Sequence, residues 1–178
     1  VKGDTSNAPD INGLPDTYVW NRSTGLYERQ PLGVNGAQPN GESRPAAVSK
    51  DNSKVLLTTL ASNLLPGDTN GFADVYIWNR WSVAYQRQPL GVGGAQPNGE
   101  STAVAISADG TKVLLWSAAS NLVAGDTNGV SDVFVWDRST GKYTRQAPGL
   151  AGTQPNGAST TGAMSADAST LFLPSLAN

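Results

Sequence analysis

The side chains best suited to chemistry lie in a short loop motif, D-x-N-G-x-x-D, which occurs three times in the chain. Its acidic and amide positions recur at an interval of 58 residues: Asp10, Asn12 and Asp16, then Asp68, Asn70 and Asp74, then Asp126, Asn128 and Asp132. Calcium binds about 6 to 8 oxygen ligands, drawn from carboxylate, amide and backbone groups, and a glycine lets the chain wrap around the ion. The residue types therefore suit a calcium site in each loop.

Calcium binding is one of two interpretations of this motif. The motif is similar to the last part of the D-x-D-x-D-G-x-x-D calcium loops, but Ala8, Pro66 and Ala124 stand where that pattern has its first carboxylate. Water or another group would have to supply that ligand. In the other interpretation the motif is an Asn-Gly turn whose aspartates cap backbone amides before a strand, and no cofactor is required.

A second repeated loop, Q-P-N-G, contains an amide pair in each copy. The pairs are Gln38 and Asn40, Gln96 and Asn98, and Gln154 and Asn156. Glu42 and Glu100 follow in the first two copies, and Ala158 takes that place in the third. A proline before Asn-Gly is typical of a turn. The alternative hypothesis is a ligand face, on which these side chains contact a glycan or a protein partner.

Aromatic and arginine side chains recur at the same interval. The aromatic pairs are Tyr18 and Trp20, Tyr76 and Trp78, and Phe134 and Trp136. Residues two apart in a strand share a face, and we expect these pairs between neighbouring sheets rather than on a sugar-binding platform. Trp81 occurs in one copy only, in a turn, where we expect it to be exposed. The repeated arginines are expected to bridge sheets and to pair with the aspartates; they are Arg22, Arg80 and Arg138, and Arg29, Arg87 and Arg145.

The composition argues against an enzyme. The chain has no histidine and no cysteine, which excludes imidazole bases, cysteine nucleophiles, disulfides and the usual zinc sites. It also lacks a G-x-S-x-G elbow and a phosphate-binding glycine loop. Acid-base catalysis needs groups whose environments differ, whereas each candidate carboxylate here recurs in a similar setting. We therefore predict a non-catalytic protein.

Charge and hydropathy limit the partners. A net charge of -2 provides no basic surface for nucleic acid. No stretch approaches the roughly 18 to 20 apolar residues that a membrane span needs, so we expect no membrane span. The absence of cysteine is compatible with export, and we expect a bacterial protein that is secreted, periplasmic or at the cell surface.

The elements that position these residues are short strands in an internal repeat. Without gaps, roughly 32 of the 53 positions from 10 to 62 are identical to those from 68 to 120. Within one repeat, turn residues separate four extended segments, at 74–80, 84–88, 102–107 and 112–117. The 20 glycines and 11 prolines fit a chain with many turns. Each repeat therefore predicts a four-stranded antiparallel sheet.

The stretch AISADGTKVLLWSAASNLVAGDTNGVSDVFVWDRSTGKYTRQ resembles the TolB-type, WD-repeat-like repeat of bacterial β-propellers. The shared elements are the turn formed by Ser107, Asp109 and Gly110, the strands KVLL and DVFVWDR, and the segment STGKYTR. The resemblance implies an all-β fold, a β-propeller built from four-stranded antiparallel blades, with three 58-residue repeats per chain. We expect Ser and Asp side chains to cap the turn in each repeat, and also at Ser49, Asp51, Ser165 and Asp167.

The strand order of that family, from inner to outer, divides the single domain 1–178 unevenly. Residues 1–45 supply only a third and an outer strand, 46–103 and 104–161 form full repeats, and 162–178 supply only an inner and a second strand. Incomplete sheets tend to recruit another strand. Three blades fall below the roughly four to eight of closed propellers. We therefore expect a homodimer that closes a six-bladed ring, with an open filament or a fragment of a longer propeller as alternatives.

These observations together predict a function in assembly and binding. The chain is expected to be a non-catalytic β-propeller scaffold or binding module that assembles through complementary half blades at its termini. Repeated weak sites on one face would add their affinities through avidity. The alternative is a calcium-dependent or calcium-stabilised glycan-binding, lectin-like protein.

Overall fold

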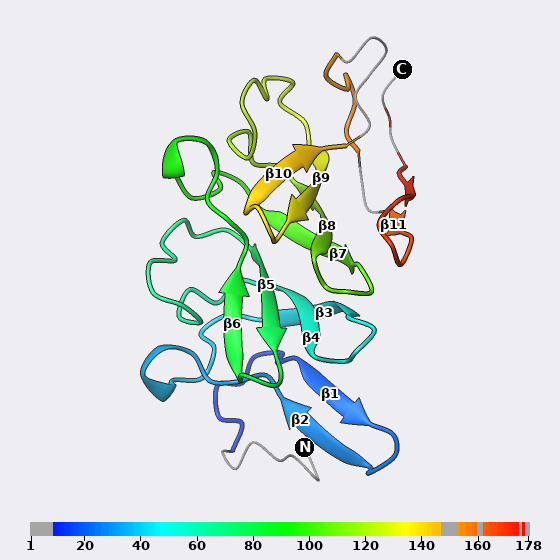
Figure 1. The fold of residues 1–178 in the computed structure, drawn as a ribbon. Coiled ribbons are helices and arrows are strands. Elements are labelled where there is room, and N and C mark those ends of the chain that lie inside the picture. Colours follow the sequence, from blue (N-terminus) through cyan, green and yellow to red (C-terminus); the bar gives the residue numbers. More distant parts are fainter. Residues whose placement is uncertain (1–8, 147–152, 160–161, 175, 177–178) are drawn as a thin grey trace.

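The computed structural model describes residues 9–146, 153–159, 162–174 and 176, which form short strands and turns (Figure 1). The strands are β1 (Tyr18–Asn21), β2 (Leu26–Arg29), β3 (Ser43–Val48), β4 (Lys54–Thr59), β5 (Asp74–Asn79), β6 (Ala84–Arg87), β7 (Ser101–Ile106), β8 (Lys112–Ser117), β9 (Asp132–Asp137), β10 (Lys142–Arg145), β11 (Ala163–Met164) and β12 (Leu171–Phe172). Two 3-10 turns, η1 (Val34–Gly36) and η2 (Val92–Gly94), follow β2 and β6. Across the described ranges, no helix has the length and apolar character that crossing a membrane would require.

The strands form four antiparallel sheets. Two sheets have four strands, in the orders β3-β4-β5-β6 and β7-β8-β9-β10, so strands that follow each other in sequence are neighbours. The other two sheets are the pairs β1-β2 and β11-β12. In Figure 1, β1 and β2 lie at the bottom, the β3–β6 sheet lies above them, and the β7–β10 sheet lies above that, with β11 beside β7.

The second and third strands of each four-stranded sheet are buried on both faces. Leu56 and Leu57 of β4 are both 0% exposed, and so are Leu114 and Leu115 of β8. Successive strand residues point to opposite faces, so other elements cover each of these sheets on both sides. The continuous apolar runs in these strands are typical of such burial. The last strands, β6 and β10, instead alternate between exposed and half-buried residues.

Two clusters of apolar side chains join neighbouring sheets. One contains Leu56 and Ile77 of the β3–β6 sheet and Trp136 of the β7–β10 sheet. The other lies around Trp78, on the opposite face of the β3–β6 sheet, and Val19 of β1 packs against it. Burial of large apolar side chains is the dominant favourable term for packing. Neighbouring sheets therefore pack face to face, and each junction between two sheets has its own apolar cluster.

Polar contacts recur at these junctions with the period of the sequence. Tyr85 Oη donates a hydrogen bond to the Pro31 carbonyl at 2.6 Å, and Tyr143 Oη donates to the Pro89 carbonyl at 2.8 Å. Backbone hydrogen bonds also link the turns of successive sheets, from Lys50 to Ala108 and from Ala108 to Ala166. Each sheet therefore contacts the next in the same relative position.

The predicted all-β class and the four-stranded antiparallel sheets are confirmed. The repeat boundaries predicted at 45/46 and 103/104 fall inside β3 and β7, because a periodic sequence repeats equally well wherever it is cut. Parts of the predicted repeats, at 1–8, 147–152 and 160–161, lie outside the described residues. Among the described strands, β1-β2 does not pair with β11-β12, so the sheets form an open array and the six-bladed ring stays a prediction.

Candidate functional site

Each D-x-N-G-x-x-D loop is a turn closed by its own asparagine. In the second copy, Asn70 Oδ1 accepts a hydrogen bond from the Phe72 amide at 3.1 Å. Its Nδ2 donates to Asp74 Oδ1 at 3.3 Å and to the Pro97 carbonyl at 3.1 Å. The same three kinds of contact recur around Asn12 and Asn128. The asparagine therefore shapes the loop and ties it to the Q-P-N-G loop of the same repeat.

In three of the four sheets, the arginine that ends the last strand approaches the aspartates of the loop. Arg87 Nη1 lies 3.5 Å from Asp68 Oδ1. The corresponding pairs are Arg29 with Asp16 at 3.9 Å, and Arg145 with Asp126 and Asp132 at 3.4 and 3.3 Å. Buried carboxylates are strongly destabilising unless a charge or hydrogen bonds compensate them. The predicted pairing with the repeated aspartates is confirmed for these three arginines, so the protein itself supplies the cation.

Asp74 has the most perturbed carboxyl group of these loops. Burial, and then repulsion by the Asp68 carboxylate, raises the pKa of Asp74 from 3.8 to about 6. Hydrogen bonds from Asn70 and Gln88 and the charge of Arg87 partly offset this rise. Gln88 Nε2 donates to Asp74 Oδ1 at 3.0 Å. Asp74 is 0% exposed, so a solute cannot reach its carboxyl group. Its protonation therefore changes the stability of the fold.

The Q-P-N-G loops lie against the D-x-N-G-x-x-D loops, through their glutamines. Gln96 Oε1 accepts a hydrogen bond from the Thr69 amide at 3.1 Å, and Nε2 donates to Thr69 Oγ1 at 2.8 Å. The other glutamines accept hydrogen bonds from loop amides, Gln38 from Ile11 and Asn12 and Gln154 from Thr127 and Asn128. The two repeated loops therefore lie side by side, and their glutamines hold them together.

The asparagines of the Q-P-N-G loops contact the segment after the second strand. Asn98 Oδ1 accepts a hydrogen bond from the Ser120 amide at 2.9 Å, and Asn98 Nδ2 donates to Ser120 Oγ at 3.0 Å. Asn40 makes the same pair of contacts with Ser62. Asn156 of the third copy is exposed. The predicted ligand-face amides in the first two copies thus serve loop structure, and ligand binding by this face stays a prediction.

In the second loop, protein donors already occupy the carboxylate oxygens that a calcium ion would need. Asn70 turns its amide nitrogen rather than its oxygen toward Asp74, and Tyr76 Oη donates to Asp68 Oδ2 at 2.8 Å. In the part of the chain that the structure describes, no group of three or more acidic, histidine or cysteine side chains is placed to hold a metal. A calcium ion would need the asparagine rotated and Arg87 displaced. Calcium binding therefore stays a prediction that requires these loops to rearrange.

The repeated tryptophans lie in two different environments. Trp78 and Trp136 are each 1% exposed and belong to the clusters between sheets, as predicted. Trp20 occupies the same repeat position in β1 but is 54% exposed. The difference arises because Val19 packs against the cluster around Trp78, so Trp20, on the other face of β1, points away from the β3–β6 sheet. Trp81 is 73% exposed in the turn after β5, as expected.

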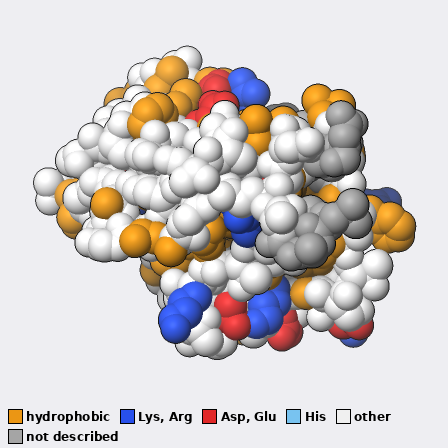
Figure 2. Space-filling model, turned by 90° about the horizontal axis from the view of Figure 1, so that it is seen from above, with side chains coloured by type: hydrophobic (Ala, Val, Ile, Leu, Met, Phe, Trp, Pro, Cys, Tyr) orange, Lys and Arg blue, Asp and Glu red, His pale blue; other side chains and the backbone are white. Residues whose placement is uncertain are grey.

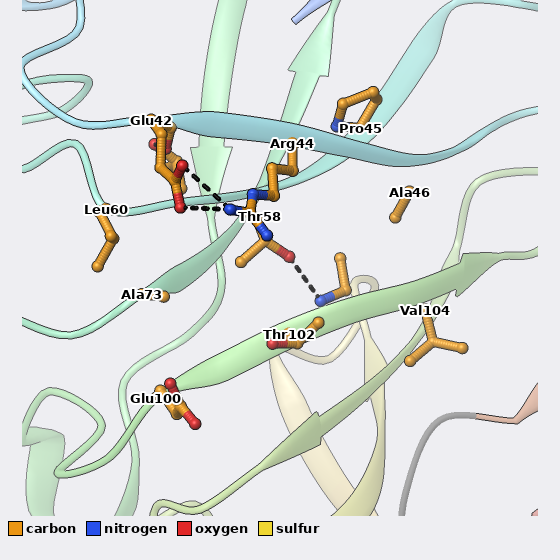
Figure 3. Close-up of a pocket in the computed structure, with 12 residues that line it drawn as sticks. Glu42, Arg44, Pro45, Ala46, Thr58, Leu60, Ala73, Glu100, Thr102 and Val104 are labelled. Carbon is orange, nitrogen blue, oxygen red and sulfur yellow. Dashed lines mark hydrogen bonds and ion pairs between the residues drawn. The ribbon is translucent and has the colours of Figure 1, made fainter. Parts of the chain in front are cut away.

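A cavity of about 480 Å³ lies between the first strands of the two four-stranded sheets, β3 and β7 (Figure 3). Glu42 and Glu100 lie in its wall, and Arg44 Nη2 forms an ion pair with Glu42 Oε1 at 3.0 Å. Beside it, Thr58 Oγ1 accepts a hydrogen bond from the Ala103 amide at 2.9 Å. This cavity was not predicted from the sequence. The only sequence signal for it is that two glutamates occupy equal repeat positions just before a strand.

A second cavity, of about 430 Å³, lies beside the unpaired edge of β1. Val19 and Trp20 line it from β1, and Ala47, Val48 and Val55 line it from β3 and β4. It too was not predicted from the sequence, since local residue patterns do not show which strands remain uncovered. Its wall is mainly apolar, which suits an apolar side chain better than a polar ligand.

Charges of opposite sign are mixed on the surface. On the face shown in Figure 2, groups of Lys and Arg side chains lie beside Asp and Glu side chains. Elsewhere in the described residues, independently of this view, Arg80 pairs with Glu28 and Lys112 with Asp137. Neighbouring charges of opposite sign largely cancel at a distance.

Comparisons with known proteins find similarity to solved structures, and no similarity to a family model or to a curated protein. Among solved structures, the crystal structure of TolB from Acinetobacter baumannii is similar, with a TM-score of 0.51 and 22% sequence identity. The similarity covers 88% of this chain but only 31% of the TolB chain. The described chain therefore has a TolB-like β-fold and spans less than a third of the TolB chain.

Proposed function

We propose that this chain is a non-catalytic β-propeller scaffold or binding module that assembles with copies of itself through the β1-β2 and β11-β12 sheets. The observation that carries the proposal is the different pairing of equivalent strands. The strands β5 and β9 are each paired on both edges, whereas β1, at the same repeat position, has β2 as its one partner among the described strands. An unpaired strand edge presents backbone donors and acceptors that favour addition of another strand.

Apolar side chains support the same proposal. Trp20 of β1 is 54% exposed, although Trp78 at the same repeat position is 1% exposed. Phe172 of β12 is 69% exposed, although Leu56 at its repeat position is 0% exposed. Exposed apolar groups at positions that are otherwise buried favour association. A second copy is the partner that fits, because it carries both kinds of incomplete sheet.

The non-catalytic part of the proposal rests on how the repeated polar groups are used. Asp68 and Arg87 form an ion pair, and Gln96 joins two loops. The raised pKa of Asp74 follows first from burial, and the group is 0% exposed. A general acid or base must instead lie within hydrogen-bond reach of a substrate. Burial in the fold therefore accounts for the raised pKa of Asp74, and no catalytic role is needed to explain it.

The solution mass tests this proposal. Light scattering is expected to give about twice 18.5 kDa for a ring of two copies, and much larger species would indicate the same contact in an open filament. The Trp20→Lys variant places a charge on β1 at a side chain that is 54% exposed, and is expected to reduce the mass to that of one copy. The matched control is Val83→Lys, at a residue that is 66% exposed in a turn. A wild-type mass of 18.5 kDa at all concentrations would contradict the proposal.

A further inference from the structure

The unpaired edge of β1 has a defined set of backbone groups. The carbonyls of Thr17 and Asn21 accept hydrogen bonds from the β2 side and from the turn before it. Backbone groups of successive residues in a strand point to alternate edges. The amides and carbonyls of Tyr18 and Trp20 therefore face the edge that β2 does not cover.

The next sheet shows which strand covers this edge when the sheet is complete. In β5, Tyr76 lies opposite Leu57 of β4, and Trp78 lies opposite Val55. The third sheet repeats the pattern, with Phe134 opposite Leu115 and Trp136 opposite Val113. The missing neighbour of β1 is therefore a strand of the β4 and β8 type, paired in that register.

The strand β12 is the third of this type, and within the part of the chain that the structure describes no strand pairs with its second edge. The Thr170 carbonyl and the Leu176 amide form hydrogen bonds with residues on the β11 side. By alternation, Leu171 and Leu173 direct their amides and carbonyls to the other edge. Pro174 lacks an amide hydrogen, but its nitrogen falls on the β11 side. The proline therefore does not interrupt pairing at the unpaired edge.

From these edges we propose that β12 of one copy pairs with β1 of a second copy in a single register, with Leu171 opposite Trp20 and Leu173 opposite Tyr18. The inference rests on the proposed assembly and adds the residues that form its interface. Two incomplete sheets then make one four-stranded sheet, in the order β11-β12-β1-β2. Each backbone group at the two edges gains a partner, as in β4-β5 and β8-β9.

The same register accounts for the apolar cavity beside β1. It places Phe172 of one copy opposite Val19 of the second copy, as Leu56 lies opposite Ile77 and Leu114 opposite Val135. Both leucines are 0% exposed. The cavity of about 430 Å³ lies against Val19, so it can take the Phe172 side chain, which is 69% exposed in one copy.

The register also determines a contact to the sheet before it. Within the chain, Arg80 Nε donates to Glu28 of the preceding sheet at 2.9 Å. Arg138 Nε makes the same contact to Gln86, also at 2.9 Å. In the proposed register, the corresponding contact is between Arg22 of one copy and Thr144 of the other copy. Both residues are exposed in a single copy. A threonine lacks the carboxylate or amide oxygen that accepts from the guanidinium group in the other two junctions, so a carboxylate at this position is expected to strengthen the contact.

A disulfide cross-link tests the register directly. In the β7–β10 sheet, Lys112 lies opposite Asp137, and its Nζ donates to that carboxylate. In the proposed register, Thr170 of one copy corresponds to Lys112, and Asn21 of the second copy corresponds to Asp137. The backbone groups of both residues point away from the new contact, and such pairs lie about 4.5 Å apart, within the range for a disulfide. The chain has no cysteine of its own. We expect the Asn21→Cys/Thr170→Cys double variant to form a covalent dimer on a non-reducing gel, whereas Ser23→Cys/Thr170→Cys forms little.

A pair of charge variants provides a second readout that needs no cysteine. Thr144→Glu places a carboxylate opposite Arg22 of the other copy, and Thr144→Lys places a like charge there. We expect the dissociation constant to fall about fivefold for the glutamate variant and to rise by a similar factor for the lysine variant. The difference is expected to shrink at high salt, because such pairs are exposed to solvent.

The outcomes separate this inference from the proposed function. A wild-type assembly without the cross-link, and with equal dissociation constants for the two Thr144 variants, would leave assembly standing and overturn the register. A wild-type chain that is monomeric at all concentrations would overturn both. Cross-linking in the double variant together with a charge effect of the expected sign supports both.

Discussion

At the scale of single residues, the repeated aspartates are compensated by protein groups. Asp74 receives hydrogen bonds from Asn70 and Gln88, and Arg87 lies beside Asp68. These contacts lower the cost of burying carboxylates but do not remove it for Asp74, whose pKa is raised to about 6. The loop that most resembles a metal site is therefore a structural unit with a measurable pH dependence.

The Asp74→Asn variant is expected to be more stable than wild type at neutral pH, by about 1 to 3 kcal/mol. The pKa of Asp74 is raised to about 6 on folding, so the unfolded chain loses this proton first as pH rises. The free energy of unfolding of wild type should then fall between about pH 4 and pH 6, and this fall should be absent from the variant. Urea unfolding across that range measures both quantities.

Asp109→Asn is a control for which the expected change in stability at neutral pH has the opposite sign, because the pKa of Asp109 is lowered. Hydrogen bonds from the Ser107 hydroxyl and from Thr111 lower the pKa of Asp109 to about 2, so its contribution is present above the unfolded pKa and is lost as pH falls. This variant should lose stability at neutral pH. A destabilised Asp74→Asn variant at pH 7 would show that the ionised Asp74 carboxylate stabilises the fold.

Calcium is expected to have no effect on thermal stability, because Asn70 and Arg87 already direct donors at the loop carboxylates. The measurement is the melting temperature in excess calcium and in EDTA, with magnesium as the control ion. A ligand that binds only the folded state raises the melting temperature. A rise specific to calcium would show that the loops rearrange to bind it and would favour the lectin-like alternative.

At the scale of elements, β1 and β5 have nearly the same sequence and different surroundings. Both carry an aromatic residue and a tryptophan two positions apart, at Tyr18 and Trp20 and at Tyr76 and Trp78. Strand β5 has neighbours on both edges, and β1 has β2 alone among the described strands. The energetic role of a tryptophan in these strands is therefore decided by its sheet.

Replacing the two tryptophans by alanine should have different consequences. Trp78→Ala is expected to lower the free energy of unfolding by about 3 to 5 kcal/mol, because the side chain is 1% exposed in a packed cluster. Trp20→Ala should cost a single chain less than about 1 kcal/mol but weaken assembly, since the side chain is 54% exposed. Urea unfolding and light scattering separate the effects. Equal losses of stability in both variants would mean that Trp20 is buried within one chain.

At the scale of the whole molecule, the junctions between sheets repeat the same contacts. Tyr85 to Pro31 and Tyr143 to Pro89 are one such pair, and the turn-to-turn backbone hydrogen bonds are another. A structure made of equivalent junctions can be extended by one more junction of the same kind. The open array is therefore compatible with closure by a second copy.

Assembly predicts that stability depends on protein concentration. The melting temperature of the wild-type chain should rise with concentration, because association stabilises the folded state by mass action. A tandem fusion of two copies makes both junctions of the ring intramolecular and should melt at a temperature that is independent of concentration. A wild-type melting temperature that stays constant over a hundredfold range of concentration would argue against assembly.

The sequence predicted the element types and most of the local contacts of the candidate site. The turns at Asp109 and Asn70, and the pairing of Arg87 with the loop aspartates, follow from residue types at fixed spacing. The cavities beside β1 and between β3 and β7 did not follow from it. They form between sheets whose strands are distant in the sequence, so local patterns carry no record of them.

By itself, the sequence determined that this protein is made of repeated antiparallel strands, because alternation, turn residues and a 58-residue period are local properties of the chain. Only the tertiary structure decided which copies of a repeated residue are buried. Trp20 and Trp78 occupy the same place in nearly the same motif and differ from 54% to 1% in exposure. Burial depends on what packs against each face of a strand, and in β1 Val19 packs against the cluster around Trp78 whereas Trp20 lies on the other face.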